Sequence, residues 1–457
     1  MRIRTADGLP CHAPAPSPLR LKRARRTASS CRRLLAIGFA LLAGWSIGSV
    51  GSSLAAAEPA HWNQWRGPQR TGEVPGGSWG EKLQGHLEEL WSVSLEPSYS
   101  GPLVWGDTVF TTETVDRDQE RVTALSLDGG DVRWTAQWPG FMAVPFFAAA
   151  NGDWIRSTPI CDGENLIVFG MRDRLVNLDP RTGKIRWEVD FPESLGDRLQ
   201  PFGAVCSPLI EGDALFVQAG GGLCKIALAD GEILWKTLEG GQDMMSGGAF
   251  SSPVIADIGG TRQLIVQTRL ELCGVDPTDG SVLWRKPIEA FRGMNILTPL
   301  VIGDRVFTAA HSGKSLLLSI GNGRGDGGGD RWDVREVWDQ KTQGYMSSPV
   351  LIDGYIYLHL KNQRFTCLDA DSGEIRWTTP PFGKYWSMAH AGDKILALDA
   401  DGTLRLIRAD PAKFDLLDEV RVAEDSWAHL AVAGEHLIVR DLAALHVFRW
   451  DRTGRGE

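Results

Sequence analysis

One short phrase that returns along the chain limits its possible folds more than any other feature. The most complete copy, residues 178–187, reads Leu-Asp-Pro-Arg-Thr-Gly-Lys-Ile-Arg-Trp. Asp and Thr side chains hydrogen-bond the backbone of tight turns, and Gly supplies the positive φ that such turns need. The phrase occurs five times, and its copies end at Trp134, Trp187, Trp235, Trp284 and Trp377. An internal repeat of this kind predicts a repeat architecture.

A second phrase precedes each copy: a small residue, Pro, three apolar residues and a Gly/Asp turn. Eight such openings are present, two of them degenerate, near Pro102, Pro159, Pro208, Pro253, Pro299, Pro349, Ser387 and Ser426. Each unit holds four β-rich runs, and four-stranded units repeated about every 40–50 residues are typical of propeller blades. We therefore predict an all-β fold, an eight-bladed β-propeller of four-stranded antiparallel blades, with seven blades as the alternative.

The two ends of the repeat region complement each other. Residues 90–95 have the pattern of a fourth strand without a blade before them, and the last unit, residues 426–450, lacks a clear fourth strand. We predict that the N-terminal strand completes the last blade, because a closed ring leaves no exposed sheet edge. The five repeat tryptophans named above are predicted to dock each blade on its neighbour.

The repeat resembles the signature of a known family. Residues 178–187 match nearly all of Ala-x-Asp-x-x-Thr-Gly-x-x-x-Trp, the signature of pyrroloquinoline-quinone-like (PQQ-like) repeat propellers, and the resemblance covers roughly residues 90–450. That superfamily includes quinoprotein dehydrogenases and the outer-membrane assembly lipoprotein BamB. The resemblance implies the fold and leaves the function open, because functional sites are grafted onto folds.

Residues 1–57 have the pattern of a secretory signal with a long basic n-region. Arg32 and Arg33 precede an apolar run over residues 34–50, and three alanines follow at 55–57. The run is short and broken by Gly for a membrane span, so we expect a periplasmic or secreted protein, by Sec or twin-arginine export. An uncleaved signal would instead anchor it in the membrane. No Cys follows the apolar run, so the lipid attachment of the BamB lipoproteins is not expected.

We interpret residues 58–89 as an N-terminal extension, 90–450 as the propeller and 451–457 as a disordered tail. Residues 61–68 resemble the Trp-x-Gln-Trp-Arg-Gly-Pro opening of secreted PQQ-like repeat proteins and are expected to pack across one face of the ring. The five cysteines after the signal are expected to be small buried strand residues, with a Cys206–Cys224 disulfide as the alternative.

Two insertions interrupt the blades. Residues 138–147 are apolar and aromatic, which predicts either a lid over one channel mouth or a partner-binding patch. Residues 321–330 are rich in Gly and Asp, and we expect a flexible hairpin tip there.

The residues just before each Pro phrase should lie around one mouth of the channel, where the innermost strands begin. Mixed aromatic and polar groups at a concave mouth form a default ligand-binding site; the alternative is that they fill the axis as blade packing. The candidates are Trp154, Arg156, Gln200, Phe202, Met245, Phe250, Asn295, Tyr345, Trp386 and Trp427, with His390 and His429 at matching places in the two degenerate blades. Structural strand histidines are the alternative interpretation of those two.

The chain carries no recognisable catalytic motif. It has no nucleophile elbow, phosphate loop, zinc pair or supported carboxylate dyad, and it lacks the adjacent cysteines usual beside the quinone in quinoprotein dehydrogenases. We therefore predict no catalytic residue, metal or cofactor, with PQQ and calcium as the alternative. The net charge of −9 argues against nucleic acid. The expected function is a monomeric, non-catalytic exported scaffold that binds an envelope or extracellular protein or a small ligand; the alternative is a PQQ-dependent oxidoreductase.

Overall fold

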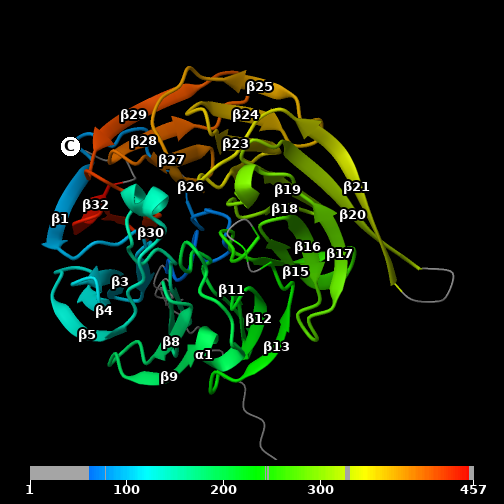
Figure 1. The fold of residues 1–457 in the computed structure, drawn as a ribbon. Coiled ribbons are helices and arrows are strands. Elements are labelled where there is room, and N and C mark those ends of the chain that lie inside the picture. Colours follow the sequence, from blue (N-terminus) through cyan, green and yellow to red (C-terminus); the bar gives the residue numbers. More distant parts are fainter. Residues whose placement is uncertain (1–60, 78, 242, 244–245, 325–329, 452–457) are drawn as a thin grey trace, which may run out of the picture. The chain divides into compact units, whose positions relative to one another are not determined.

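The computed structural model describes residues 61–77, 79–241, 243, 246–324 and 330–451. The chain divides into two compact units, residues 1–56 and 57–457. The first unit, with the predicted signal, lies outside the described residues. In the second unit the strands form eight four-stranded antiparallel sheets, arranged as a ring in Figure 1. The predicted eight-bladed β-propeller is confirmed, and the seven-bladed alternative is wrong.

Each of the first seven blades consists of four consecutive strands, so the sheet order follows the chain order. Blade 1 consists of β2 (Leu103–Trp105), β3 (Thr108–Val115), β4 (Gln119–Ser126) and β5 (Val132–Pro139), and blade 2 of β6 (Ile160–Cys161), β7 (Leu166–Gly170), β8 (Arg174–Leu178) and β9 (Ile185–Asp190). Blade 3 consists of β10 (Leu209–Glu211), β11 (Ala214–Ala219), β12 (Gly222–Ala227) and β13 (Ile233–Thr237), and blade 4 of β14 (Val254–Ile258), β15 (Thr261–Gln267), β16 (Glu271–Val275) and β17 (Val282–Pro287). The helical segments η1 (Phe146–Asn151), α1 (Phe191–Leu195) and η2 (Phe291–Gly293) lie in the loops between these blades.

The remaining blades follow the same plan. Blade 5 consists of β18 (Leu300–Ile302), β19 (Arg305–Ala309), β20 (Ser315–Arg324) and β21 (Asp330–Gln340), and blade 6 of β22 (Val350–Ile352), β23 (Tyr355–His359), β24 (Phe365–Asp369) and β25 (Ile375–Thr378). Blade 7 consists of β26 (Ser387–Ala391), β27 (Lys394–Leu398), β28 (Thr403–Arg408) and β29 (Asp415–Arg421), and blade 8 contains β30 (Ala431–Ala433), β31 (His436–Arg440) and β32 (Ala444–Trp450). The second and third strands are largely buried on both faces because neighbouring blades cover both, and all five residues of β7 are buried. The outer strands alternate between partly buried and exposed residues, as β1 and β29 do.

The last blade takes its outer strand from the start of the propeller. Strand β1 (Leu87–Ser94) pairs antiparallel with β32, with Leu87 opposite Trp450 and Ser94 opposite Ala444. The predicted ring closure is therefore confirmed, although the strand begins three residues before the predicted boundary at residue 90. Closure leaves no blade of the described ring with a missing strand.

The repeat phrase serves to dock one blade on the next. On six outer strands a tryptophan indole donates from Nε1 to a carbonyl in the turn between the third and fourth strands of the following blade, or just beside it. The pairs are Trp91 with Leu127, Trp134 with Pro180, Trp187 with Leu228, Trp235 with Thr278, Trp338 with Ala370, and Trp377 with Asp410, at 2.8–3.2 Å. Where the turn contains Gly, the indole lies against it, and a Cβ on Gly183 would come within 2.3 Å of Trp134.

Trp284 does not make the hydrogen bond to the next blade's turn that the other repeat tryptophans make, although it shares a buried cluster with Val306 and Leu318 of that blade. Its Nε1 donates to Gln263 Oε1 of the same blade at 2.6 Å, and the side chain is buried. The turn that would receive it is replaced, because β20 and β21 continue as a long hairpin to residues 324 and 330. Figure 1 shows this hairpin extending beyond the rim. The five residues 325–329 at its predicted tip lie outside the described residues.

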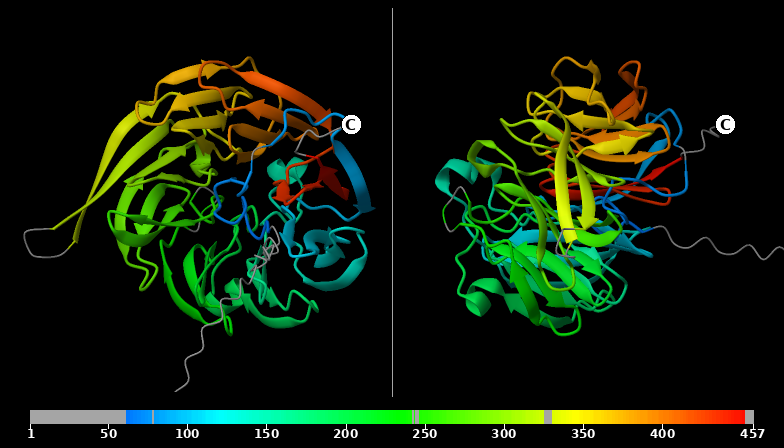
Figure 2. Two further views of the ribbon diagram at one scale, coloured as in Figure 1. Left: turned by 180° about the vertical axis from the view of Figure 1, so that it is seen from behind. Right: turned by 90° about the vertical axis from the view of Figure 1, so that its right-hand side faces the viewer.

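Residues 61–74, which we call the axial segment, enter one end of the ring and contact its inner strands. Trp62 forms an antiparallel bridge with Val104, and Val74 donates its N–H to the His390 carbonyl at 2.8 Å. The Trp65 indole donates to Thr298 Oγ1 at 2.8 Å. In Figure 2, left, this dark blue segment lies over the centre of the ring, in the view from behind.

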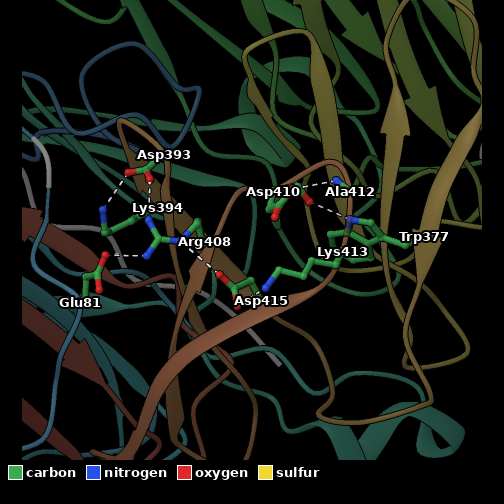
Figure 3. A network of polar contacts seen from close by, with 9 residues as sticks. All are labelled: Glu81, Trp377, Asp393, Lys394, Arg408, Asp410, Ala412, Lys413 and Asp415. Atoms are coloured by element: carbon green, nitrogen blue, oxygen red, sulfur yellow. Dashed lines mark hydrogen bonds and ion pairs between the residues drawn. The ribbon is translucent and has the colours of Figure 1, made fainter.

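Residues 75–86 then carry the chain outward to β1. Arg408 of β28 contacts Glu81 of this stretch together with Asp393 and Asp415 of its own blade (Figure 3). The Trp450 indole donates to the Lys82 carbonyl at 3.1 Å. The extension is thus bonded to blades 7 and 8 before it becomes part of the ring.

The five described cysteines are buried free thiols: Cys161, Cys206, Cys224, Cys273 and Cys367. The alternative of a Cys206–Cys224 disulfide is therefore wrong. Burial raises the pKa of the Cys206 and Cys224 thiols to about 12, so both stay protonated and unreactive at neutral pH.

Candidate binding site at the open mouth

The topology gives the two ends of the ring different surfaces. Strands alternate in direction within each blade, so every loop that leads from an outer strand to the next inner strand lies at the same end. We call this end the open mouth. The docking turns lie at the opposite end, and so does the turn after β2, where the Gly106 N–H donates to His61 of the axial segment at 3.1 Å.

Seven of the loops at the open mouth contribute an aromatic side chain that is neither fully buried nor fully exposed. We call this set the aromatic collar: Tyr99, Trp154, Phe202, Phe250, Tyr345, Tyr385 and Trp427. Trp427 stacks on Tyr99 with ring centroids 5.0 Å apart and meets Tyr385 edge-on at 4.7 Å. Tyr385 lies 5.7 Å from Tyr345, and Phe202 lies 5.6 Å from Phe250. Adjacent blades therefore present two runs of contacting aromatic rings, one of Tyr99, Trp427, Tyr385 and Tyr345 and one of Phe202 and Phe250.

Arg269 links the phenylalanine side of the collar to the loop before blade 5. Its guanidinium lies over Phe250, 4.4 Å from the ring centroid, and donates to the carbonyls of Gly293 and Arg292 at 2.7 Å each. Burial lowers the pKa of Arg269 to about 10, which still leaves it charged at pH 7. The cation thus fixes the position of the Phe250 ring.

Six of the predicted site residues lie at this mouth: Trp154, Arg156, Phe202, Phe250, Tyr345 and Trp427. The Trp154 side chain hydrogen-bonds the Tyr99 hydroxyl. Arg156 donates to the carbonyls of Gly152 at 2.8 Å and Trp154 at 3.2 Å, so it holds its own loop. Met245 lies outside the described residues.

Three other predicted residues are buried supports beneath the collar. Gln200 donates to Asp173 and accepts from the Ala249 N–H at 2.9 Å. Asn295 is fully buried and donates to the Arg269 carbonyl at 3.0 Å. Trp386 is 2% exposed, and its ring stacks on His359 with centroids 4.4 Å apart. The side chains of Asn295 and Trp386 are not available to a ligand in this arrangement.

His390 and His429 lie beside the axial segment. His429 meets the Trp65 ring at 4.8 Å, and the His390 N–H donates to the Gly72 carbonyl at 2.8 Å. Burial, and then the charge of Arg66, lower the pKa of His390 to about 4 and of His429 to about 3. Both are neutral at pH 7 and pack against the axial segment. No cluster of metal-ligating side chains occurs within the described ranges.

Two buried arginines hold the axial segment in place. Arg66 donates to the carbonyls of Thr71 and Pro349, and Arg70 to those of Pro208 and Ser207. Burial lowers the pKa of Arg66 to about 9 and of Arg70 to about 10. These carbonyls stand at the beginnings of inner strands, so the segment, which enters from the opposite end, reaches along the axis toward the open mouth.

The apolar insertion adds exposed phenylalanines to this mouth. Phe146 is 91% and Phe147 is 48% exposed, and Phe147 meets Phe202 of the collar with ring centroids 6.2 Å apart. Leu270 and Phe291, in the loops around blades 4 and 5, are also exposed. We call Phe146, Phe147, Leu270 and Phe291 the mouth patch. All four side chains belong to loops at the open mouth, and exposed apolar groups on one face are typical of an interaction surface.

Sequence comparison identifies the family. The family model described as "Outer membrane protein assembly factor BamB" matches residues 118–379, more than half of the chain. The chain belongs to this family. BamB of Yersinia pestis is 22% identical over 275 residues, which cover 54% of this chain and 64% of the relative. BamB of Alkalilimnicola ehrlichii is 26% identical over 171 residues, covering 36% and 41%. The chain thus aligns with less than two thirds of the length of either relative.

Solved structures show the same fold. BamB from Moraxella catarrhalis superposes with a TM-score of 0.58 at 14% identity, covering 80% of this chain and all of that one. Quinohemoprotein alcohol dehydrogenase from Comamonas testosteroni superposes with a TM-score of 0.51 at 12% identity, covering 89% and 82%. At these identities the likeness extends to the propeller and not to a shared activity.

Proposed function

We propose that the chain is a non-catalytic scaffold of the cell envelope that binds another protein at the open mouth. One observation carries this proposal: the axial segment occupies one end of the ring, while the other end exposes the mouth patch beside the aromatic collar. Aromatic side chains and arginine at a concave, partly desolvated surface are the usual anchors of protein interfaces. The names of the relatives, outer membrane protein assembly factors, agree with an envelope role.

A quinone-dependent oxidoreductase fits the residues less well. A flat quinone needs free aromatic faces and a metal site. His359 stacks on one face of the Trp386 ring, and Tyr99 stacks on one face of the Trp427 ring. The scaffold proposal therefore includes no quinone and no calcium, and addition of both to the purified protein with a dye acceptor is expected to give no turnover.

The envelope location is part of the same proposal. Its support is the apolar run at residues 34–50 and the names of the relatives. Across the described residues, no helix is both long and apolar enough to span a bilayer. N-terminal sequencing of protein from the envelope fraction is expected to start near Glu58; a start within residues 1–50 would contradict removal of the signal.

The double substitution Phe146→Ser with Phe147→Ser is expected to weaken partner binding by roughly 30-fold or more, because truncating one hot-spot aromatic typically costs about 2 kcal/mol. The measurement is quantitative capture of envelope proteins by immobilised protein, followed by titration of the captured partner. The matched control is Leu234→Ser with Leu416→Ser, since these exposed apolar side chains lie on outer strands far from the mouth loops. Equal loss in both variants, or loss in neither, contradicts the proposal.

A further inference from the structure

A hollow of about 230 Å³ opens at the mouth where blades 5, 6 and 7 meet. Its lining includes His311, Tyr345, His359, Lys361, Lys384 and Tyr385. The volume is below the roughly 300–1,000 Å³ of sites for drug-sized ligands, so the hollow suits a group of about the size of one side chain. It lies directly beside the aromatic collar, because Tyr345 and Tyr385 belong to both.

The hollow is cationic and has no acidic lining residue. The Lys361 ammonium reaches the Ser312 hydroxyl at 3.4 Å, and the Lys384 ammonium lies 4.5 Å from the Tyr385 ring centroid. Neither lysine forms an ion pair with any residue that the structure describes. Asp425 interacts with Lys384 only at longer range and does not line the hollow.

The two histidines do not add charge at neutral pH. Burial lowers the pKa of His311, with the charge of Lys361 as the second cause, and burial lowers the pKa of His359 to about 4. The positive charge of the hollow therefore comes from the two lysines, which are both exposed and so can move toward a ligand.

The backbone holds an aromatic wall beside this charge. Tyr385 has φ of 55°, a left-handed conformation that is rare for a bulky residue. This conformation places its ring between Tyr345 and Trp427. Such backbone conformations persist where the surrounding structure requires a particular side-chain direction, and here that direction forms the boundary between the hollow and the collar.

We propose that this hollow binds the carboxylate of a Glu or Asp side chain in an extended segment of the partner protein. The carboxylate pairs with the ammonium groups of Lys361 and Lys384, and the apolar residues that flank it pack on Tyr345, Tyr385 and Trp427. The proposal rests on the proposed function, since it requires a protein at the mouth. A free small carboxylic acid would share the chemistry of the carboxylate, and the experiment separates the two sources.

The test uses a library of blocked seven-residue peptides with random flanks and a fixed central Glu, Gln or Lys, applied to the purified propeller. Glu-centred peptides are expected to be enriched roughly tenfold over Gln-centred ones, because charge-assisted hydrogen bonds are the strong ones. Lys361→Gln and Lys384→Gln should each reduce this preference, and the double variant should abolish it. The matched control Lys341→Gln removes the same charge from an exposed neighbouring loop outside the hollow and should change nothing.

Absence of any preference for Glu, including absence of capture, overturns the proposal. Lysine-dependent binding of phenylacetate or inorganic phosphate without a peptide preference assigns the hollow to a small anion and also overturns it. The two proposals can fail separately. If the Phe146 and Phe147 variant loses partner binding but the peptides show no preference for Glu, the scaffold function stands and the carboxylate site in the hollow is rejected. Both lysines are exposed, so unchanged thermal unfolding of the variants is expected and is measured alongside.

Discussion

Deletion of residues 58–95 is expected to give a protein that aggregates or is degraded, whereas deletion of residues 58–86 is expected to give a soluble ring of lower stability. The longer deletion removes β1, which pairs with β32 from Leu87 opposite Trp450 to Ser94 opposite Ala444. Without it, β32 becomes an unpaired edge, and unpaired apolar edges template association between molecules. The shorter deletion keeps β1 and removes only the axial segment and the stretch after it.

Size-exclusion chromatography and thermal unfolding distinguish these outcomes. The full chain without its signal is the reference. If both truncated proteins remain soluble monomers with the same unfolding temperature, β1 does not close the ring in solution. If both aggregate alike, the residues before β1 and not β1 itself carry the effect, and the contacts of Trp79 and Leu83 with the last blade become the explanation.

Gly183→Ala is expected to destabilise the propeller by about 2–5 kcal/mol, the sum of a left-handed backbone penalty of about 1–2 kcal/mol and an overpacking penalty of about 1–3 kcal/mol. Gly183 has φ of 70°, and an added Cβ would lie 2.3 Å from the Trp134 ring. The matched control is Gly354→Ala, since Gly354 has φ of 80° but nothing within 4 Å of an added Cβ. The control variant should be destabilised only by the left-handed backbone penalty, about 1–2 kcal/mol.

Chemical denaturation measures both variants, and a double-mutant cycle with Trp134→Ala isolates the contact. In the Trp134→Ala background, Gly183→Ala should cost no more than Gly354→Ala, because the indole is gone. Equal costs for the two glycine substitutions in the natural background would show that the repeat tryptophan does not press on the next blade, and the docking role of the phrase would be rejected.

The fold could be predicted because its signals are local and repeated. Each turn phrase specifies its own hairpin, and eight openings fix the number of blades. The docking role of Trp338 was missed because the Gly-rich insertion separates it from its Asp turn, so the spacing is lost. Trp284 was assigned to docking for the opposite reason: its own phrase is complete, but the next blade has a long hairpin where the receiving turn should be.

The candidate site could be predicted only in part, because a loop sequence does not specify which way a side chain points. Trp386 was chosen for the mouth, yet its neighbour Tyr385 lies there, since the left-handed backbone at Tyr385 turns the two rings in different directions. Likewise, His390 and His429 were assigned to the mouth, but they contact residues near position 70, more than 300 positions away in sequence. No local pattern carries such a long-range contact.

The position of β1 also dictates an order of assembly. The Lys82 carbonyl and the Trp450 indole that meet in the finished ring are 368 residues apart, so the first part of the propeller to leave the ribosome must wait for the last. During that interval the axial segment can pair with β2 but lacks its late contacts with Pro349, His390 and His429. Folding governed by such distant contacts is slow and leaves apolar surface exposed in intermediates. A chain built this way closes its ring in a single late step.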